Sequence, residues 1–254
     1  MVKKRLFCLG VCLLSLMCLL SCGLEVFYYI GYIPDSNYVD ISNASVQLPS
    51  SGTEGYSSYF THFEIFYRIY ISDMLQTGKI EAQQLSSINP RLNTDYSSLY
   101  GLTNKTSTSD PPTNLENTFS YRKYYKLALE GADINNILAG GSLGGTLVFD
   151  FDQNPGVRPR MILNGTPYVL HRANVGSGIG DFEPQPNRYF NNHPDLCNTA
   201  NITDKLNADT ETNSKSNLEY TYVSMYIAAI GADFITTIYS QPTFIGIFML
   251  PNSS

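Results

Sequence analysis

The sequence predicts an all-β fold, an antiparallel β-sandwich, from three observations. Aromatic and β-branched residues alternate strictly from Tyr59 to Ile71, and since both faces carry apolar side chains we expect a central strand there. Further short apolar stretches are separated by Gly, Pro and Asn turn signals, of which Asn164-Gly165 is a typical tight hairpin. Strands do not alternate with long helices, which argues against a parallel βαβ sheet.

The segments before the central strand also favour strands. The apolar and aromatic stretch from Gly23 to Tyr32 predicts a first strand that ends at Pro34-Asp35. Val39 to Leu48 contains a second strand, and the Gly- and Ser-rich residues 50–58 form a turn region.

A single amphipathic helix is expected in the middle of the chain. Asn89-Pro90 has the composition of an N-cap followed by proline at the first helical position. Apolar residues then recur at helical spacing as far as about Tyr100: Ile88, Leu92, Tyr96 and Leu99. The polar residues from Thr103 to Asn114 have nothing to bury and predict a loop.

The second half of the chain returns to strands. The predicted strands are Phe119–Leu129, Thr146–Asp152, Val157–Leu163, Pro167–His171, Tyr220–Ile230 and Thr243–Leu250. The polar loops 103–118 and 174–217 are expected to cluster on one rim as a recognition surface.

The first 21 residues have the parts of a secretory signal. Lys3, Lys4 and Arg5 precede an almost uninterrupted apolar run from Leu6 to Leu20. The run has about 15 residues, fewer than the ~20 that a membrane-spanning helix needs. An ordinary signal peptide and an uncleaved membrane helix are the alternatives.

The end of this run, Leu19-Leu20-Ser21-Cys22, resembles the lipobox of bacterial lipoproteins. It is most similar to the lipobox of spirochaetes, which accepts a large residue such as Leu20 two positions before the cysteine. The resemblance implies that residues 1–21 are removed and that Cys22 receives diacylglycerol and an N-acyl chain. Residues 22–254 would then be a single domain, anchored in the bilayer of the cell envelope through Cys22. In enterobacteria an Asp directly after the cysteine keeps a lipoprotein at the inner membrane. Gly23 stands at this position, so we expect the outer membrane or the cell surface rather than the inner membrane.

Charge and cysteine content limit the partners. Removing three of the 16 basic residues leaves 13 against 22 acidic residues, a formal net charge of −9, which disfavours nucleic acid as a partner. Cys197 is the only cysteine after Cys22, so no internal disulfide is expected, and it is interpreted as a small half-buried residue.

Catalytic and metal sites have weak signals. Gly140-Gly141-Ser142-Leu143-Gly144 matches G-x-S-x-G and makes Ser142 the candidate nucleophile of a serine hydrolase, but a strand rather than a helix follows it. Asp150 and Asp152 have the spacing of the first ligands in a calcium-binding loop, but the glycine and the final acidic residue that such a loop needs are missing from the sequence that follows. No metal and no cofactor other than the acyl chains at Cys22 is expected.

Tyrosine is abundant, with 19 residues and no tryptophan. Several tyrosines form clusters in the sequence, and tyrosine is frequent at recognition surfaces. The candidate binding residues are therefore Tyr28, Tyr29, Tyr32, Tyr124 and Tyr125. The alternative is ordinary packing within a β-sandwich.

Two stretches resemble a fibronectin type III module. Residues 222–231, then Tyr239-Ser-Gln-Pro242 and a closing strand, are similar to its last hairpin, and residues 63–70 are similar to its third strand. The resemblance implies an immunoglobulin-like sandwich in which residues of roughly 73–217, with the short helix and the polar loops, form a long central insertion. The function we expect is a non-enzymatic binding, adhesion or structural module of the envelope whose ligand is a protein or glycan, and the alternative is a surface or periplasmic hydrolase that uses Ser142.

Overall fold

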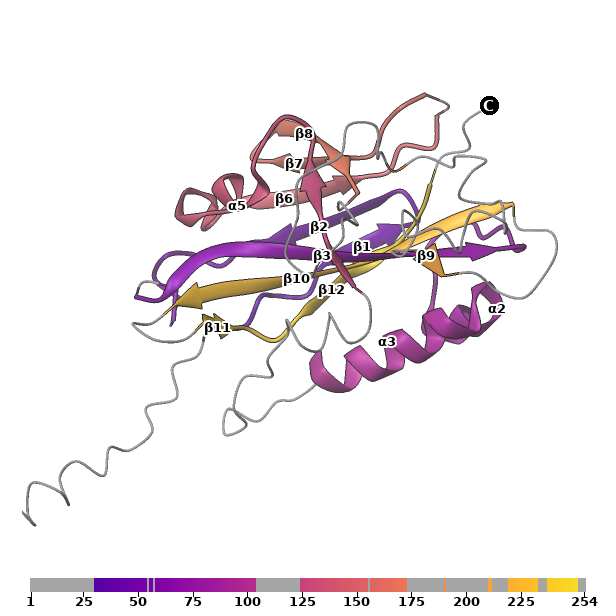
Figure 1. Cartoon of the computed structure of the whole chain (residues 1–254), viewed down its shortest axis with the longest axis horizontal. Helices are drawn as coiled ribbons and strands as arrows, with labels where there is room; N and C mark the ends of the chain where they lie inside the picture. Colours follow the sequence, from indigo (N-terminus) through magenta and orange to yellow (C-terminus); the bar gives the residue numbers. More distant parts are fainter. Residues whose placement is uncertain are drawn as a thin grey trace, which may run out of the picture.

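The computed structural model is a β-sandwich of two sheets with two helices packed beneath the second (Figure 1). It describes residues 30–53, 55–56, 58–103, 124–154, 156–172, 190, 210–211, 219–232 and 237–250. The all-β prediction is confirmed, and the pairings described are antiparallel except for one short parallel contact.

The first sheet has the order β1-β2-β6-β7-β8-β5. These strands are β1 (Asn37–Asp40), β2 (Asn43–Gln47), β5 (Ala128–Leu129), β6 (Thr146–Asp150), β7 (Arg160–Leu163) and β8 (Thr166–His171). The expected meander is therefore present as β6, β7 and β8. Its second turn is the Asn164-Gly165 hairpin, in which both residues have positive φ, 50° and 86°, as a type I′ turn requires.

The second sheet is built on two long neighbours, β3 (Phe60–Ser72) and β10 (Tyr220–Ala232). Their register runs from Ser72 opposite Tyr220 to Phe60 opposite Gly231, so residues 148 to 171 positions apart in the chain lie side by side. The sheet is completed by β4 (Tyr125–Lys126), β9 (Thr210–Glu211), β11 (Thr237–Tyr239) and β12 (Thr243–Met249). Both β11 and β12 pair with β10.

Both faces of β3 are buried, as the alternating pattern predicts for a central strand. Phe63, Ile65 and Tyr67 belong to the core between the two sheets, together with residues of the first sheet such as Leu147 and Phe149. The opposite face carries Phe66 and Tyr70, which pack in two smaller clusters. Figure 1 shows the resulting layers: the β6–β8 part of the first sheet, then β3 with β10, then α3 (Pro90–Thr103).

The short helices are η1 (Ala82–Gln84), α2 (Leu85–Ile88), α5 (Ile134–Ile137) and η2 (Gly140–Ser142).

The amphipathic helix α3 begins at Pro90 as predicted. Asn89 caps it, since its side-chain oxygen accepts the Arg91 N–H at 2.9 Å, and its amide donates to the Ile71 carbonyl of β3 at 3.2 Å. Asn89 therefore fixes the helix to the end of the central strand.

A buried polar network joins α3 to the second sheet. Asp95 of α3 and Arg68 of β3 are both fully buried, and Arg68 Nη1 lies 3.4 Å from Asp95 Oδ2. The same carboxylate oxygen accepts a hydrogen bond from the Tyr70 hydroxyl at 2.9 Å. The Tyr70 hydroxyl also lies 3.1 Å from the Tyr124 hydroxyl. Burial and the Asp95 carboxylate raise the pKa of Tyr70 well above its usual value, so this hydroxyl stays protonated.

Three strand expectations differ from the structure. Ile30 to Ser36 form no strand, and the remainder of the expected first strand lies outside the described residues. Val39–Leu48 belongs to a hairpin of two strands, because Ile41 and Ser42 form a turn. The described part of Phe119–Leu129 is two short strands in different sheets, because the chain passes from β4, paired with β3, to β5, paired with β8.

Candidate functional site

A pocket of about 310 Å³ opens where loop 30–36, the η1–α2 segment, α3 and the edge strands β1 and β12 meet. Its volume is at the small end of the range for ligand pockets. Aromatic and charged side chains share the lining, which consists of Tyr32, Asp35, Ser36, Tyr38, Lys79, Ile80, Glu81, Ala82, Leu85, Tyr96, Phe244 and Ile247.

The Tyr38 side chain, which lines the pocket, is buried and fixed by hydrogen bonds at its hydroxyl. Its hydroxyl donates to the Ile247 carbonyl at 2.6 Å and accepts the Ile80 N–H at 3.3 Å. Gly246 of β12 leaves room for the ring: a Cβ there would lie 2.6 Å from Tyr38 Cδ2. Burial raises the pKa of Tyr38 to about 12, so the phenol is neutral at physiological pH.

Two further rings from distant parts of the chain complete the wall. Phe244 of β12 meets Tyr96 of α3 edge-to-face with ring centroids 5.2 Å apart, and meets Tyr38 in the same way at 6.3 Å. Ser36 fixes the loop opposite them, since its hydroxyl donates to the Ile245 carbonyl at 2.6 Å. The pocket wall is therefore an aromatic cluster attached to two edge strands.

Tyr32 lies at the mouth of the pocket and is the one candidate binding residue that the structure places there. Its exposed fraction is 49%, the highest among the aromatic side chains that the structure describes. Its hydroxyl donates to Asp35. Partial burial and the Asp35 carboxylate raise the pKa of Tyr32 to about 12, so the exposed ring carries no charge.

Charged groups surround the aromatic wall. The Lys79 ammonium lies 5.9 Å from the centre of the Tyr38 ring, within the range of a cation–π contact. It also lies 3.7 Å from the Glu81 carboxylate. With Asp35, the lining residues carry two negative charges and one positive charge, so the lining has a net negative charge.

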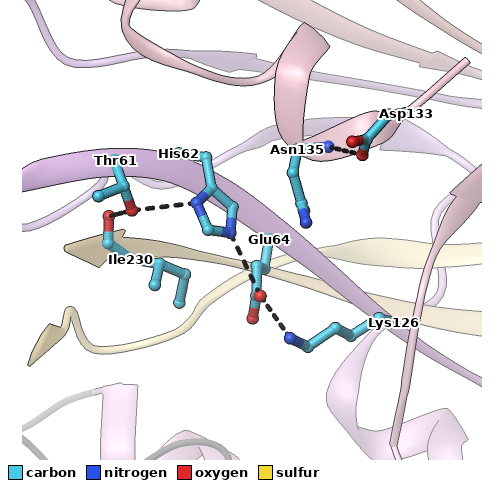
Figure 2. A network of polar contacts seen from close by, with 7 residues as sticks. All are labelled: Thr61, His62, Glu64, Lys126, Asp133, Asn135 and Ile230. Carbon is cyan, nitrogen blue, oxygen red and sulfur yellow. Dashed lines mark hydrogen bonds and ion pairs between the residues drawn. The ribbon is translucent and has the colours of Figure 1, made fainter. Parts of the chain in front are cut away.

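A second polar cluster lies near the start of β3, away from the pocket, and Figure 2 shows its contacts. The buried Glu64 carboxylate is its centre: Oε1 lies 2.5 Å from Lys126 Nζ of β4 and 3.3 Å from His62 Nε2. Burial raises the pKa of Glu64, but the His62 hydrogen bond and the Lys126 ammonium outweigh this effect, so the pKa is lower than usual. Glu64 is therefore ionised at neutral pH.

The cluster contains a hydroxyl–imidazole–carboxylate chain, because Thr61 Oγ1 also lies 3.0 Å from His62 Nδ1. The Thr61 hydroxyl donates to the Ile230 carbonyl of the neighbouring strand at 2.9 Å (Figure 2). None of the pocket-lining residues belongs to this cluster. The geometry is that of a cross-strand network that fixes β3 against β4 and β10.

Ser142, the candidate nucleophile, lies in η2 and is buried, with an exposed fraction of 1%. Its hydroxyl donates to the Ala139 carbonyl at 2.7 Å, and within the described ranges no hydrogen bond links it to a histidine. Asp150 and Asp152 are similarly engaged: Asp150 pairs with Arg160 at 2.5 Å, and Asp152 accepts two hydrogen bonds from Asn154. In the part of the chain that the structure describes, no group of three or more His, Cys, Asp or Glu side chains is placed to hold a metal ion.

The other tyrosine candidates do not join the pocket. Tyr124 is buried, with its ring edge-to-face on Tyr226 at 5.4 Å, so the packing interpretation applies to it. Tyr125 is half-buried against Tyr67, with ring centroids 6.4 Å apart. Tyr28, Tyr29, the lipidation candidate Cys22 and the greater part of both predicted rim loops lie outside the described residues.

Sequence reasoning missed most of the pocket. Lys79, Glu81, Tyr96 and Phe244 line it with Tyr32, yet they come from segments up to 212 positions apart. Tyr96 and Phe244 were expected on a helix and a strand, but no motif indicates that these elements meet. The only local signal was the group of tyrosines around Tyr32 in the sequence.

Comparison with known proteins found no match, whether with protein-family models, with curated proteins or with solved structures. Over the described ranges, none of the helices combines the length and the apolar character needed to cross a membrane.

Proposed function

We propose that the chain is a lipid-anchored envelope protein without catalytic activity, which binds a glycan or protein ligand in the Tyr32 pocket. The observation that carries this proposal is the pocket itself, with an exposed aromatic ring at its mouth. Convergent polar groups on an aromatic wall are typical of binding sites. A spacer with a purely structural role has no need of such a pocket, or of the half-exposed Tyr32 ring that lines it.

The pocket also lies close to the proposed anchor. Tyr32 follows Cys22 by ten residues, and a fully extended chain of that length spans at most about 35 Å. With acyl chains on Cys22, the pocket would work within that distance of the bilayer. Its ligand would then be a component of the envelope surface or a molecule that approaches it.

The anchor is tested by fatty-acid incorporation. Cells that express the chain are grown with a labelled fatty acid, and we expect label in the wild type and none in Cys22→Ala. Label that persists in Cys22→Ala would contradict lipidation at this residue. Protease treatment of intact cells then reports whether the domain is on the outer surface.

Ligand binding is tested with the purified full-length protein on a glycan microarray and against solubilised envelope proteins. Tyr32→Ala removes the exposed ring, whereas Leu75→Ala removes an apolar side chain of similar exposure, 52%, outside the pocket. We expect binding that Tyr32→Ala reduces by about tenfold or more, the usual cost of an aromatic anchor, and that Leu75→Ala leaves unchanged. Equal loss in both variants, or binding that neither affects, would refute a role for the pocket.

The hydrolase alternative rests on the motif around Ser142. A buried hydroxyl that donates to a backbone carbonyl is not poised for attack, because an activated serine needs a base within hydrogen-bond reach. Labelling of the wild type, but not of Ser142→Ala, by a fluorophosphonate probe would favour the hydrolase and overturn the non-enzymatic proposal.

A further inference from the structure

The electrostatic character of the pocket indicates what it binds. An aromatic face attracts a cation such as an ammonium or a guanidinium through the quadrupole of the ring. The pocket already holds one such contact, because the Lys79 ammonium sits over the Tyr38 ring at 5.9 Å while the Glu81 carboxylate lies 3.7 Å from it. A lysine of the chain itself thus already places its ammonium within cation–π range of this wall.

An anionic ligand suits the pocket less well. Asp35 and Glu81 contribute two carboxylates, and the one ammonium, Lys79, is already next to Glu81. Tyr32 and Tyr38 stay protonated, so their rings remain neutral aromatic surfaces rather than phenolates. The surface beyond has the same sign, since the chain without its leader has a formal net charge of −9 and attracts basic partners over long range.

We propose that the Tyr32 pocket binds a lysine side chain of a partner protein, with the ammonium between the carboxylates of Asp35 and Glu81 and the methylenes against the aromatic wall. This inference rests on the proposed binding function and selects the protein ligand over the glycan. The volume of about 310 Å³ suits one long side chain rather than a whole peptide segment. Lys79 is then a resident cation that competes with the incoming one.

The positive charge of Lys79 provides a test, because its removal should change the affinity in opposite directions for cationic and anionic ligands. Lys79→Met keeps most of the side-chain stem and removes a positive charge, so it should tighten a lysine ligand, weaken an anionic ligand and leave a neutral ligand nearly unchanged. Glu81→Gln should do the opposite, and its carboxylate is 60% exposed, so folding is not at risk. One charge about 6 Å away in a water-rich site corresponds to on the order of fivefold in Kd.

The probes are Nα-acetyl-lysine methylamide and its Nε-acetylated counterpart, which has the same stem without the charge. Binding to the purified full-length protein is followed by chemical shifts of the tyrosine rings. We expect the charged probe to bind and the neutral probe to bind at least about fivefold more weakly. We also expect tighter binding to Lys79→Met and weaker binding to Glu81→Gln, with both effects reduced at high salt.

The other outcomes overturn the inference in distinguishable ways. Equal binding of both lysine probes, or binding of N-acetylglucosamine that neither charge variant alters, would refute selectivity for a cation while the binding function stands. Weaker binding of the charged probe to Lys79→Met than to the wild type would refute the competition with Lys79 and the ammonium site proposed here. No shift with any probe would refute the lysine inference, and only the failure of the Tyr32→Ala comparison would refute the binding function itself.

Discussion

The buried pair of Arg68 and Asp95 provides the most demanding test of the structure. Asp95→Asn preserves side-chain volume and an acceptor for the Tyr70 hydroxyl, but it leaves the Arg68 guanidinium without the carboxylate 3.4 Å away. At that distance and an effective dielectric constant of about 20, the lost attraction is roughly 5 kcal/mol. Since the variant also removes the desolvation cost of a buried carboxylate, we expect a net loss of about 3 kcal/mol.

The assay is urea unfolding followed by far-ultraviolet circular dichroism, with linear extrapolation of the free energy of unfolding. Arg91→Ala is the matched control, because Arg91 contacts the same carboxylate at 3.0 Å but is half-exposed, and its loss should cost below about 1 kcal/mol. Arg68→Met combined with Asp95→Asn should be more stable than the sum of the two single changes implies. A cost below about 1 kcal/mol for Asp95→Asn, or strict additivity, would refute the reasoning.

Three other predictions concern the pocket and the titratable groups. Gly246→Ala should lower the free energy of unfolding by about 1–3 kcal/mol and weaken probe binding, because its Cβ displaces the Tyr38 ring; Gly52→Ala, where a Cβ meets nothing within 4 Å, should be neutral in the same urea and binding assays. The lowered pKa of Glu64 means that its stabilising contribution is present above the usual value of 4.5 and is lost as pH falls below it. Acid unfolding followed by circular dichroism should therefore be less steep in Glu64→Gln than in the wild type, and identical profiles would contradict this. Burial raises the pKa of Tyr38 and Tyr222 from 10.0 to about 12, so stability should be complete below pH 10 and fall as pH rises toward 12. Tyrosinate absorbance should then rise together with the loss of circular dichroism, and complete ionisation before unfolding would disprove the burial of these rings.

Local patterns predicted the elements in which each residue's surroundings are set by its near neighbours. The alternation around Phe63 and Phe66 identified the central strand because both faces are buried, and Asn89-Pro90 identified a helix start because capping involves adjacent residues. Asn164-Gly165 predicted a hairpin for the same reason.

Features that depend on distant contacts were not predictable in this way. The stretch ending at Leu129 alternates like one strand, yet the chain leaves one sheet for the other at the buried Leu127. The pocket is a similar case, since Tyr96 and Phe244 have ordinary core patterns and become a wall only through the packing of α3 on β12. Tyr32 was nominated because it belongs to a tyrosine cluster, but Tyr124 belongs to another such cluster and is buried, and nothing in the sequence distinguishes the two.

The pairing of β3 with β10 also has a consequence for the time course of folding. The central strand is synthesised before its partner, which comes about 150 residues later, so a very long chain segment must close before the register from Ser72 to Phe60 can form. Contacts of such large sequence separation slow folding. In the interval, a 13-residue strand that is apolar on both faces stays unpaired, and such strands are prone to associate with other chains. We therefore expect refolding to be slow and strongly dependent on protein concentration, and a chaperone that shields this strand to raise the yield of folded protein.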